Sequence, residues 1–314
     1  MREKCPDAED ASNAMTTFQG AYTALITPFV ADSSKVDFDR LAQNIEEQAA
    51  GGVSGVVPCG TTGESPTLSD QEHRALVEKV VELAKPRGLT VIAGAGSNDT
   101  SYAIHLHRFS HAVGADAALH VTPYYNRPSQ EGLYQHFMAI ADSCDLPIVL
   151  YNIPGRTTVA LTGDTIHRLS AHPNIRAIKE ATGSLDLASE INLRTDLQLL
   201  SGDDSLTLPI ASVGGVGVIS VVSNLVPERV AALCEAFLNN DWPAAQEFHR
   251  ELFALSRGLL GLAVNPVPIK TALALLGRDT GTVRLPLCSP DDDVRQSIKK
   301  LLAAGNLQSA KVSV

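Results

Sequence analysis

The sequence predicts an α/β fold, a (β/α)8 TIM barrel with a C-terminal helical extension. Short apolar runs rich in β-branched residues alternate with amphipathic stretches of helical period along most of the chain. The runs are apolar throughout rather than alternating, which is typical of parallel strands that helices cover. After about residue 225 the strand-like runs stop and only helical patterns remain. These three observations together indicate the fold.

Eight of the apolar runs are predicted to be strands, and eight β/α units in about 200 residues suit the lower end of the size range of this barrel. A doubly wound open sheet is the alternative that the same alternation allows. In chain order, the predicted strands are Tyr22–Ile26, Gly55–Pro58, Thr90–Gly94, Ala118–Thr122, Ile148–Asn152, Ala177–Lys179, Leu197–Ser201 and Gly217–Val221.

Helical segments are predicted between the strands, because apolar residues recur there every three or four positions. Residues that commonly cap helices stand at the start of several of them, namely Asp37, Ser69, Asp99 and Thr162. The segments include Phe38–Ala50, Asp70–Ala84, Thr100–Val113, Gly132–Ala141 and Thr162–Leu169.

Further helices are predicted beyond residue 225. At the last of them, Ser289 is expected to be the cap and Pro290 a first-turn residue, followed by three acidic residues that the helix dipole favours. The acidic triplet therefore needs no metal ion to explain it. These segments are Glu228–Asn239, Pro243–Leu260, Pro268–Leu276 and Asp291–Ala304.

Three parts of the chain follow from these patterns. They are a disordered N-terminal tail at residues 1–17, the barrel at residues 18–225 and a C-terminal helical domain at residues 226–314. The start of the tail carries four acidic side chains and no apolar stretch. We therefore expect it to be neither a secretory signal nor a typical transit peptide.

The composition of the 314 residues, 44% hydrophobic and 19% charged, is that of a globular protein. The net charge of −10 repels a phosphate backbone, so nucleic-acid binding is not expected, although a pocket can still attract a small anion. No run of 18 apolar residues occurs, so no membrane span is expected. The five cysteines lie far apart without a CxxC pair, which fits a reducing cytoplasm and neither a disulfide framework nor a zinc site.

Functional side chains are expected at the carboxyl ends of the strands, because these ends surround the active site in this barrel. Hydroxyls, phenols, one lysine and one arginine meet there, without a His, Asp or Glu cluster of metal-ligand spacing. The segments concerned are Gly60–Glu64, Thr122–Asn126, Tyr151–Thr157, Ile178–Glu180 and Gly217–Ser220.

Lys179 is the most informative residue of this set. It is the only lysine between Lys85 and Lys270, and it follows the apolar pair Ala177-Ile178. A barrel interior favours the neutral amine, which is the nucleophile that condenses with a keto acid. The alternative is a lysine at a strand end whose side chain reaches water.

The other candidates supply hydrogen-bond donors. Thr61 and Thr62 lie between glycines at a strand end, where hydroxyls and backbone N–H groups can bind a carboxylate, although an ordinary turn has the same pattern. Arg156 suits a second carboxylate, and its alternative is a surface ion pair. Tyr124-Tyr125 and Tyr151 add phenols, and their alternative is simple packing.

Metal and nucleotide sites are not expected. Of the closely spaced His105, His107 and His111, only the last two share a helical face, and no carboxylate has ligand spacing with them. The glycine-rich segments at residues 94–96 and 214–217 lack the spacing of dinucleotide and phosphate-binding loops.

The motifs at the strand ends resemble the dihydrodipicolinate synthase family, part of the N-acetylneuraminate lyase superfamily of class I aldolases. The resemblance runs from about Gly20 to the C-terminus. It implies the condensation of pyruvate with L-aspartate 4-semialdehyde to 4-hydroxy-tetrahydrodipicolinate in lysine and diaminopimelate biosynthesis. The motifs are Gly60–Glu64, Tyr124–Pro128, Tyr151–Thr157, Ile178–Thr182 and Ser201–Asp204.

The resemblance also implies the catalytic roles. Lys179 matches the lysine that forms a Schiff base with pyruvate, and Tyr151 matches the group that donates and accepts protons during imine formation. Thr61 and Tyr125 match the partners of this tyrosine in a proton relay, with Tyr125 supplied by a neighbouring subunit. No cofactor is implied, because the protonated imine is itself the electron sink.

Substrate binding and assembly follow from the same resemblance. Thr62 and the backbone carbonyl of Ile219 match contacts to pyruvate, and Arg156 matches the group that binds the carboxylate of the aldehyde. The implied assembly is a homotetramer of two tight dimers. Two alternatives stay open: a sister aldolase that uses pyruvate with another aldehyde, and a non-catalytic sensor of keto acids. Sialic-acid lyases usually lack an arginine at the position of Arg156.

Overall fold

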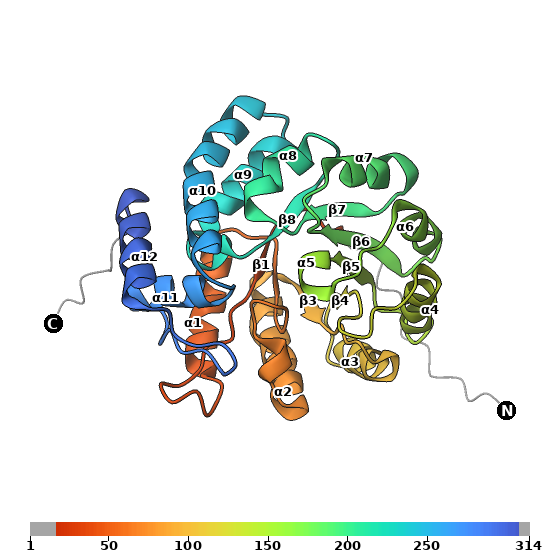
Figure 1. Cartoon of the computed structure of the whole chain (residues 1–314), viewed down its shortest axis with the longest axis horizontal. Helices are drawn as coiled ribbons and strands as arrows, with labels where there is room; N and C mark the ends of the chain where they lie inside the picture. Colours follow the sequence, from red (N-terminus) through yellow and green to blue (C-terminus); the bar gives the residue numbers. More distant parts are fainter. Residues whose placement is uncertain (1–16, 308–314) are drawn as a thin grey trace.

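The computed structural model describes residues 17–307 and shows a closed barrel of eight parallel strands inside a layer of helices (Figure 1). Each strand pairs with its neighbours in chain order, and the last strand returns to pair with the first. The predicted barrel is confirmed, and the open sheet is excluded. The strands are β1 (Gly20–Ala24), β2 (Gly55–Val57), β3 (Thr90–Gly94), β4 (Ala117–Val121), β5 (Ile148–Asn152), β6 (Ile175–Glu180), β7 (Gln198–Ser201) and β8 (Gly217–Ser220).

Helices cover the outside of the barrel, and the predicted caps hold them. The side chains of Asp37, Ser69, Asp99 and Thr162 each accept a hydrogen bond from a backbone N–H group in the first turn. The helices α5, α7 and α8 are not among the predicted segments. The helices around the strands are α1 (Phe38–Ala50), α2 (Asp70–Ala84), α3 (Thr100–Ala112), α4 (Gln130–Ala141), α5 (Pro154–Thr157), α6 (Gly163–Ser170), α7 (Leu185–Arg194) and α8 (Thr207–Ala211).

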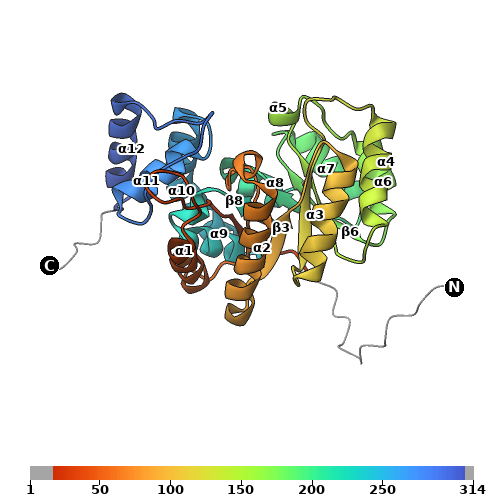
Figure 2. The same cartoon turned by 90° about the horizontal axis from the view of Figure 1, so that it is seen from below.

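Four helices follow the last strand: α9 (Pro227–Leu238), α10 (Trp242–Leu262), α11 (Val267–Leu275) and α12 (Asp292–Ala304). Helix α9 contacts β1 and α1, whereas α10, α11 and α12 contact one another beside the barrel (Figures 1 and 2). The predicted boundary between the barrel and the C-terminal helical domain, at residues 225 and 226, stays a prediction. The disordered tail stays a prediction too, because residues 1–16 lie outside the described part.

Within the described part no single helix is long and apolar enough to cross a membrane, but α10 and α11, bent by 116° at their junction, together meet that test.

Several details of the prediction are wrong, among them the first strand, which runs over Gly20–Ala24 and not over 22–26. Strand β6 extends from Ile175 to Glu180 and not only over 177–179, because it pairs with β5 from Ile148 onwards. The last helix is capped by Asp291 and not by Ser289: the Asp291 carboxylate accepts a hydrogen bond from Val294 N at 2.8 Å. Pro290 therefore precedes the helix instead of lying in its first turn.

The strands divide their side chains between two layers, because successive residues of a strand point to opposite faces. One cluster fills the inside of the barrel, and larger clusters lie between the strands and the helices. The inner cluster includes Tyr22, Leu119, Tyr151, Leu200 and Ile219. Lys179 shares the parity of Ala177, which belongs to this inner cluster, so its side chain points into the barrel.

Three buried histidines lie between β4 and the helices α3 and α4. His107 Nδ1 and His120 Nε2 are 3.1 Å apart, and His136 Nδ1 lies 2.9 Å from Thr100 Oγ1. Burial lowers the pKa of His107 and of His136 to about 4, and it lowers the pKa of His120 well below its usual value. All three rings are therefore neutral at pH 7.

These histidines should make the protein sensitive to acid. An exposed histidine titrates near pH 6.5, so below this pH the unfolded chain binds protons that the folded protein does not. We expect the free energy of unfolding to fall between pH 6.5 and about pH 4, by on the order of 1–2 kcal/mol each for His107 and His136 between pH 7 and pH 5. Urea unfolding of the protein and of His107→Gln and His136→Gln variants across this range measures the slope. An equal slope in all three would contradict the expectation.

Candidate active site

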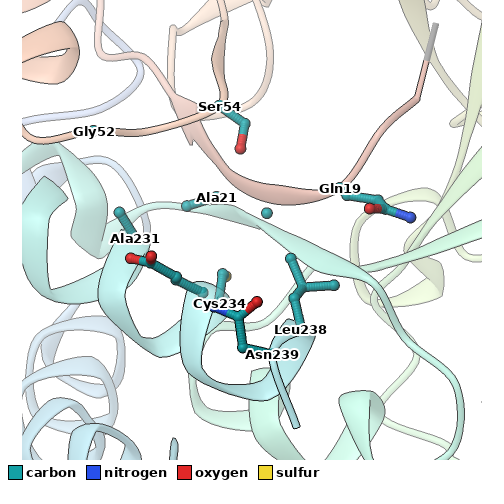
Figure 3. A pocket seen from close by; sticks show the side chains of 10 residues that line it. Gln19, Ala21, Gly52, Ser54, Ala231, Cys234, Leu238 and Asn239 are labelled. Atoms are coloured by element: carbon teal, nitrogen blue, oxygen red, sulfur yellow. The ribbon is translucent and has the colours of Figure 1, made fainter. Parts of the chain in front are cut away.

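A cavity of about 490 Å³ opens at the carboxyl ends of the strands. Its wall combines loops that follow β2, β3, β4 and β5 with segments near residues 265 and 286. Thr61 and Arg156, two of the predicted site residues, line it. A second cavity, of about 330 Å³, lies at the opposite end of the barrel between Gln19, Ser54 and helix α9, and none of the predicted site residues lines it (Figure 3).

Lys179 and Tyr151 are cross-strand neighbours on β6 and β5. The lysine Nζ lies 4.2 Å from the centroid of the tyrosine ring, and the two residues are only 5% and 4% exposed. The next residue, Glu180, points to the other face, where its carboxylate accepts hydrogen bonds from Asn152 Nδ2 and Thr182 N. Lys179 makes no ion pair with any carboxylate of the described residues. Its amine is thus buried and not held in an ion pair, as a nucleophile requires.

A second buried lysine, Lys270 on α11, was missed in the sequence. Its Nζ lies 2.8 Å from Glu64 Oε1 and donates to the backbone oxygen of Thr27 at 2.8 Å. Burial lowers the pKa of Lys270, and the Glu64 carboxylate opposes this shift. The lysine stands in the apolar segment VPIKTALAL, the same kind of pattern that made Lys179 conspicuous. Lys270 is an ion-pair partner and Lys179 is not, so the two buried lysines differ in their surroundings.

The turn that carries Thr61 and Thr62 is held from two sides. At its end, Glu64 has a left-handed backbone with a φ of 55° and forms an ion pair with Lys270. Beside it, Asn265 Nδ2 lies 2.9 Å from Thr62 Oγ1. Thr62 is buried, whereas Thr61 lines the cavity. Asn265 belongs to the junction between α10 and α11, and nothing in the sequence pattern singled it out.

Arg156 lies on the short helix α5 at the mouth of the cavity and is exposed. Its Nη2 donates to the backbone oxygen of Asn265 at 3.4 Å, and it forms no ion pair with the carboxylates of residues 17–307. The surface ion pair considered for this residue is therefore not found. A guanidinium with free donors at a cavity mouth can bind a carboxylate of a ligand.

Within one chain, the side chain of Tyr125 does not lie with the other predicted site residues. It is 91% exposed and has a left-handed φ of 71°, so it does not join the buried pair of Lys179 and Tyr151. The side chain of Ile219, in contrast, belongs to the same inner cluster of the barrel as Tyr151. Six of the seven predicted residues thus lie at the inner strand ends or around the cavity, and Tyr125 projects outward.

Comparisons with known proteins identify the family of the chain. Residues 17–305 match the Dihydrodipicolinate synthetase family. A 4-hydroxy-tetrahydrodipicolinate synthase of Endomicrobium trichonymphae is 48% identical over 287 residues, which are 91% of this chain and 97% of the relative. A similar enzyme of Methanocaldococcus jannaschii is 48% identical over 286 residues, 91% of this chain and 98% of the relative.

Solved structures of related proteins have the same fold. The crystal structure of dihydrodipicolinate synthase from Aquifex aeolicus superposes with a TM-score of 0.90 at 43% identity, covering 94% of this chain and 100% of that one. A structure described as the first monomeric dihydrodipicolinate synthase variant has a TM-score of 0.89 at 36% identity, covering 92% and 97%. This chain belongs to the dihydrodipicolinate synthetase family.

Proposed function

We infer that this protein condenses pyruvate with L-aspartate 4-semialdehyde to give 4-hydroxy-tetrahydrodipicolinate, a step in the biosynthesis of lysine and diaminopimelate. The observation that carries the inference is the buried Lys179 beside Tyr151, at the end of the barrel where the larger cavity opens. The identity to synthases over nine-tenths of the chain supports the choice of this reaction among those of pyruvate aldolases.

The reaction starts at Lys179. Its amine nitrogen attacks the keto carbon of pyruvate, and loss of water leaves a protonated imine. Tyr151 carries protons to and from the reacting oxygen, and Thr61 and Tyr125 extend the relay to solvent. The hydroxyl of Thr62 and the carbonyl of Ile219 hold pyruvate in place.

The second half of the reaction forms the new carbon–carbon bond. Loss of a proton from the pyruvate methyl group converts the imine into an enamine, which attacks the aldehyde carbon of the second substrate. Arg156 binds the carboxylate of that substrate at the cavity mouth. The substrate's own amine then attacks the imine carbon and displaces Lys179, so the product leaves as a ring and the enzyme is regenerated.

An assay of pyruvate with a panel of aldehydes tests this function. We expect the highest kcat/KM for L-aspartate 4-semialdehyde. A higher value for another aldehyde would show a sister aldolase. Trapping of pyruvate by borohydride without turnover of any aldehyde would instead show a keto-acid sensor.

Arg156→Ala should weaken the use of the aldehyde much more than the binding of pyruvate. Removing a charged hydrogen-bond partner of the substrate carboxylate lowers kcat/KM by roughly 30- to 1,000-fold. Steady-state kinetics with each substrate varied in turn measure the difference. Arg257→Ala, which removes an exposed arginine of α10, is the control. An unchanged kcat/KM for the aldehyde in Arg156→Ala would point to the sister aldolase.

We propose that the protein works in the cytoplasm as a homotetramer of two dimers, with Tyr125 completing the site of the neighbouring subunit. The 91% exposure of Tyr125 supports an inter-subunit role, and the free thiols of Cys59, Cys144, Cys234 and Cys288 support a reducing compartment. Because one structural relative is described as monomeric, the oligomer does not follow from the fold.

Mixing two inactive variants tests the role of Tyr125. A dimer of Tyr125→Phe with Lys179→Ala has one site with both side chains intact and one site with neither. Random exchange in a two-fold dimer should therefore restore about a quarter of the sites. Activity after exchange, verified by mass spectrometry of differently tagged subunits, is the measurement. No recovery would mean that Tyr125 acts within its own subunit or has no role.

A further inference from the structure

The segment Ser201–Asp204 matches the family in sequence, but the reaction described above assigns no role to it. It leaves β7 directly beside Lys179, since Lys179 is paired with Leu200 in the β6–β7 register. Gly202 N donates to the backbone oxygen of Glu180 at 2.7 Å. A side chain on Gly202 would put its Cβ 2.7 Å from the Cβ of Ala181 and 3.2 Å from the Cε of Lys179, so glycine lets the segment pass close to the end of β6.

Asp204 joins this segment to the end of β8. Its Oδ1 accepts a hydrogen bond from Ser220 Oγ at 2.5 Å. Its Oδ2 accepts from the backbone N–H groups of Val221 at 2.9 Å and Val222 at 3.2 Å. Ser220 Oγ in turn accepts from Ser223 N at 2.9 Å. One carboxylate thus fixes the whole turn that follows Ile219.

The carboxylate is costly to bury, and its contacts offset the cost. Asp204 is 8% exposed, and burial raises its pKa to about 6 although its hydrogen bonds lower it. Hydrogen bonds also hold the neighbouring residue of the loop, because Asp203 Oδ1 accepts from both the N–H and the hydroxyl of Ser205. The loop therefore links two strand ends with little freedom to move.

We propose that Asp204 is a positioning residue for pyruvate, because it fixes the carbonyl of Ile219 relative to the amine of Lys179. This proposal rests on the proposed function, in which both groups act on pyruvate. The loop holds β6 through Gly202 and β8 through Asp204. Without the carboxylate, the turn after Ile219 loses three hydrogen bonds at once, and the imine carbon and its carbonyl contact are no longer placed together.

The proposal predicts a higher KM for pyruvate and a nearly unchanged KM for the aldehyde. Asp204→Asn and Ser220→Ala should raise the KM for pyruvate by roughly 3- to 10-fold, and Asp204→Ala by roughly 10- to 100-fold. The KM for the aldehyde should stay within about two-fold of the wild type, because Arg156 lies on α5 and makes none of the hydrogen bonds of Asp204. Ser220→Ala removes the Oδ1 partner and the acceptor of Ser223 N but keeps both backbone hydrogen bonds to Oδ2, so it gives a result even if Asp204→Ala does not fold.

Asp279→Asn is the matched control. Asp279 is also a buried aspartate in a turn, 6% exposed, and its Oδ2 accepts from Gly281 N at 3.1 Å. It should lower the melting temperature without changing the KM for pyruvate. If Asp204→Asn and Ser220→Ala also lower only the melting temperature, Asp204 is a structural residue and the proposal is wrong. Failure of the wild type to form a borohydride adduct with pyruvate would instead overturn the proposed function itself.

Discussion

Lys179→Ala should fold like the wild type and form no covalent adduct with pyruvate. The amine is the only group of the proposed site that can form an imine, so its removal abolishes the reaction and does not merely slow it. Folding should survive, because the side chain makes no ion pair with the described residues and stands at the open end of the barrel. Mass spectrometry after treatment with pyruvate and borohydride measures the adduct, and peptide mapping locates it.

Two further variants serve as controls for the adduct measurement. Lys179→Arg keeps the positive charge but should also form no adduct, because a guanidinium stays protonated. Lys85→Ala, which removes a surface lysine paired with Asp116, should react like the wild type. An adduct on any other lysine in Lys179→Ala, Lys270 included, would refute the assignment.

Lys270→Met should destabilise the protein by about 3–5 kcal/mol. The substitution leaves the Glu64 carboxylate buried without its partner, and a lone buried charge is much more costly than a pair. Both side chains of this pair are 1% exposed or less. The loss should also loosen the turn that carries Thr61 and Thr62, since Glu64 ends that turn. Urea denaturation measures the free energy of unfolding.

The double variant Lys270→Met with Glu64→Gln shows whether the lone charge is the cause. It should recover a large part of the stability, since no uncompensated charge remains. Lys79→Met removes a lysine from an exposed pair with Glu82 and should cost at most about 1 kcal/mol. Equal losses in Lys79→Met and Lys270→Met would show that burial of the ion pair is unimportant here.

Lys179 and Lys270 both stand in apolar segments of the chain. The rule that singled out Lys179, a lysine inside an apolar segment, applies equally to Lys270. It could not tell the two apart, because the difference lies in the partners. Glu64 stands 206 residues from Lys270 in the chain, and no local pattern connects them.

Local patterns by themselves determined the eight strands, most of the helices and their caps, because each depends on residues only a few positions apart. They also placed Thr61, Tyr151, Arg156 and Lys179 at strand ends, which the barrel then gathers at one rim. The tertiary structure alone decided which groups meet across the chain. Asn265 reaches Thr62 over 203 positions, and Asp204 holds the end of β8 from the end of β7. Such contacts depend on how α10 and α11 return to the barrel and how neighbouring strands align, and these arrangements are set by packing of the whole core and not by any short segment.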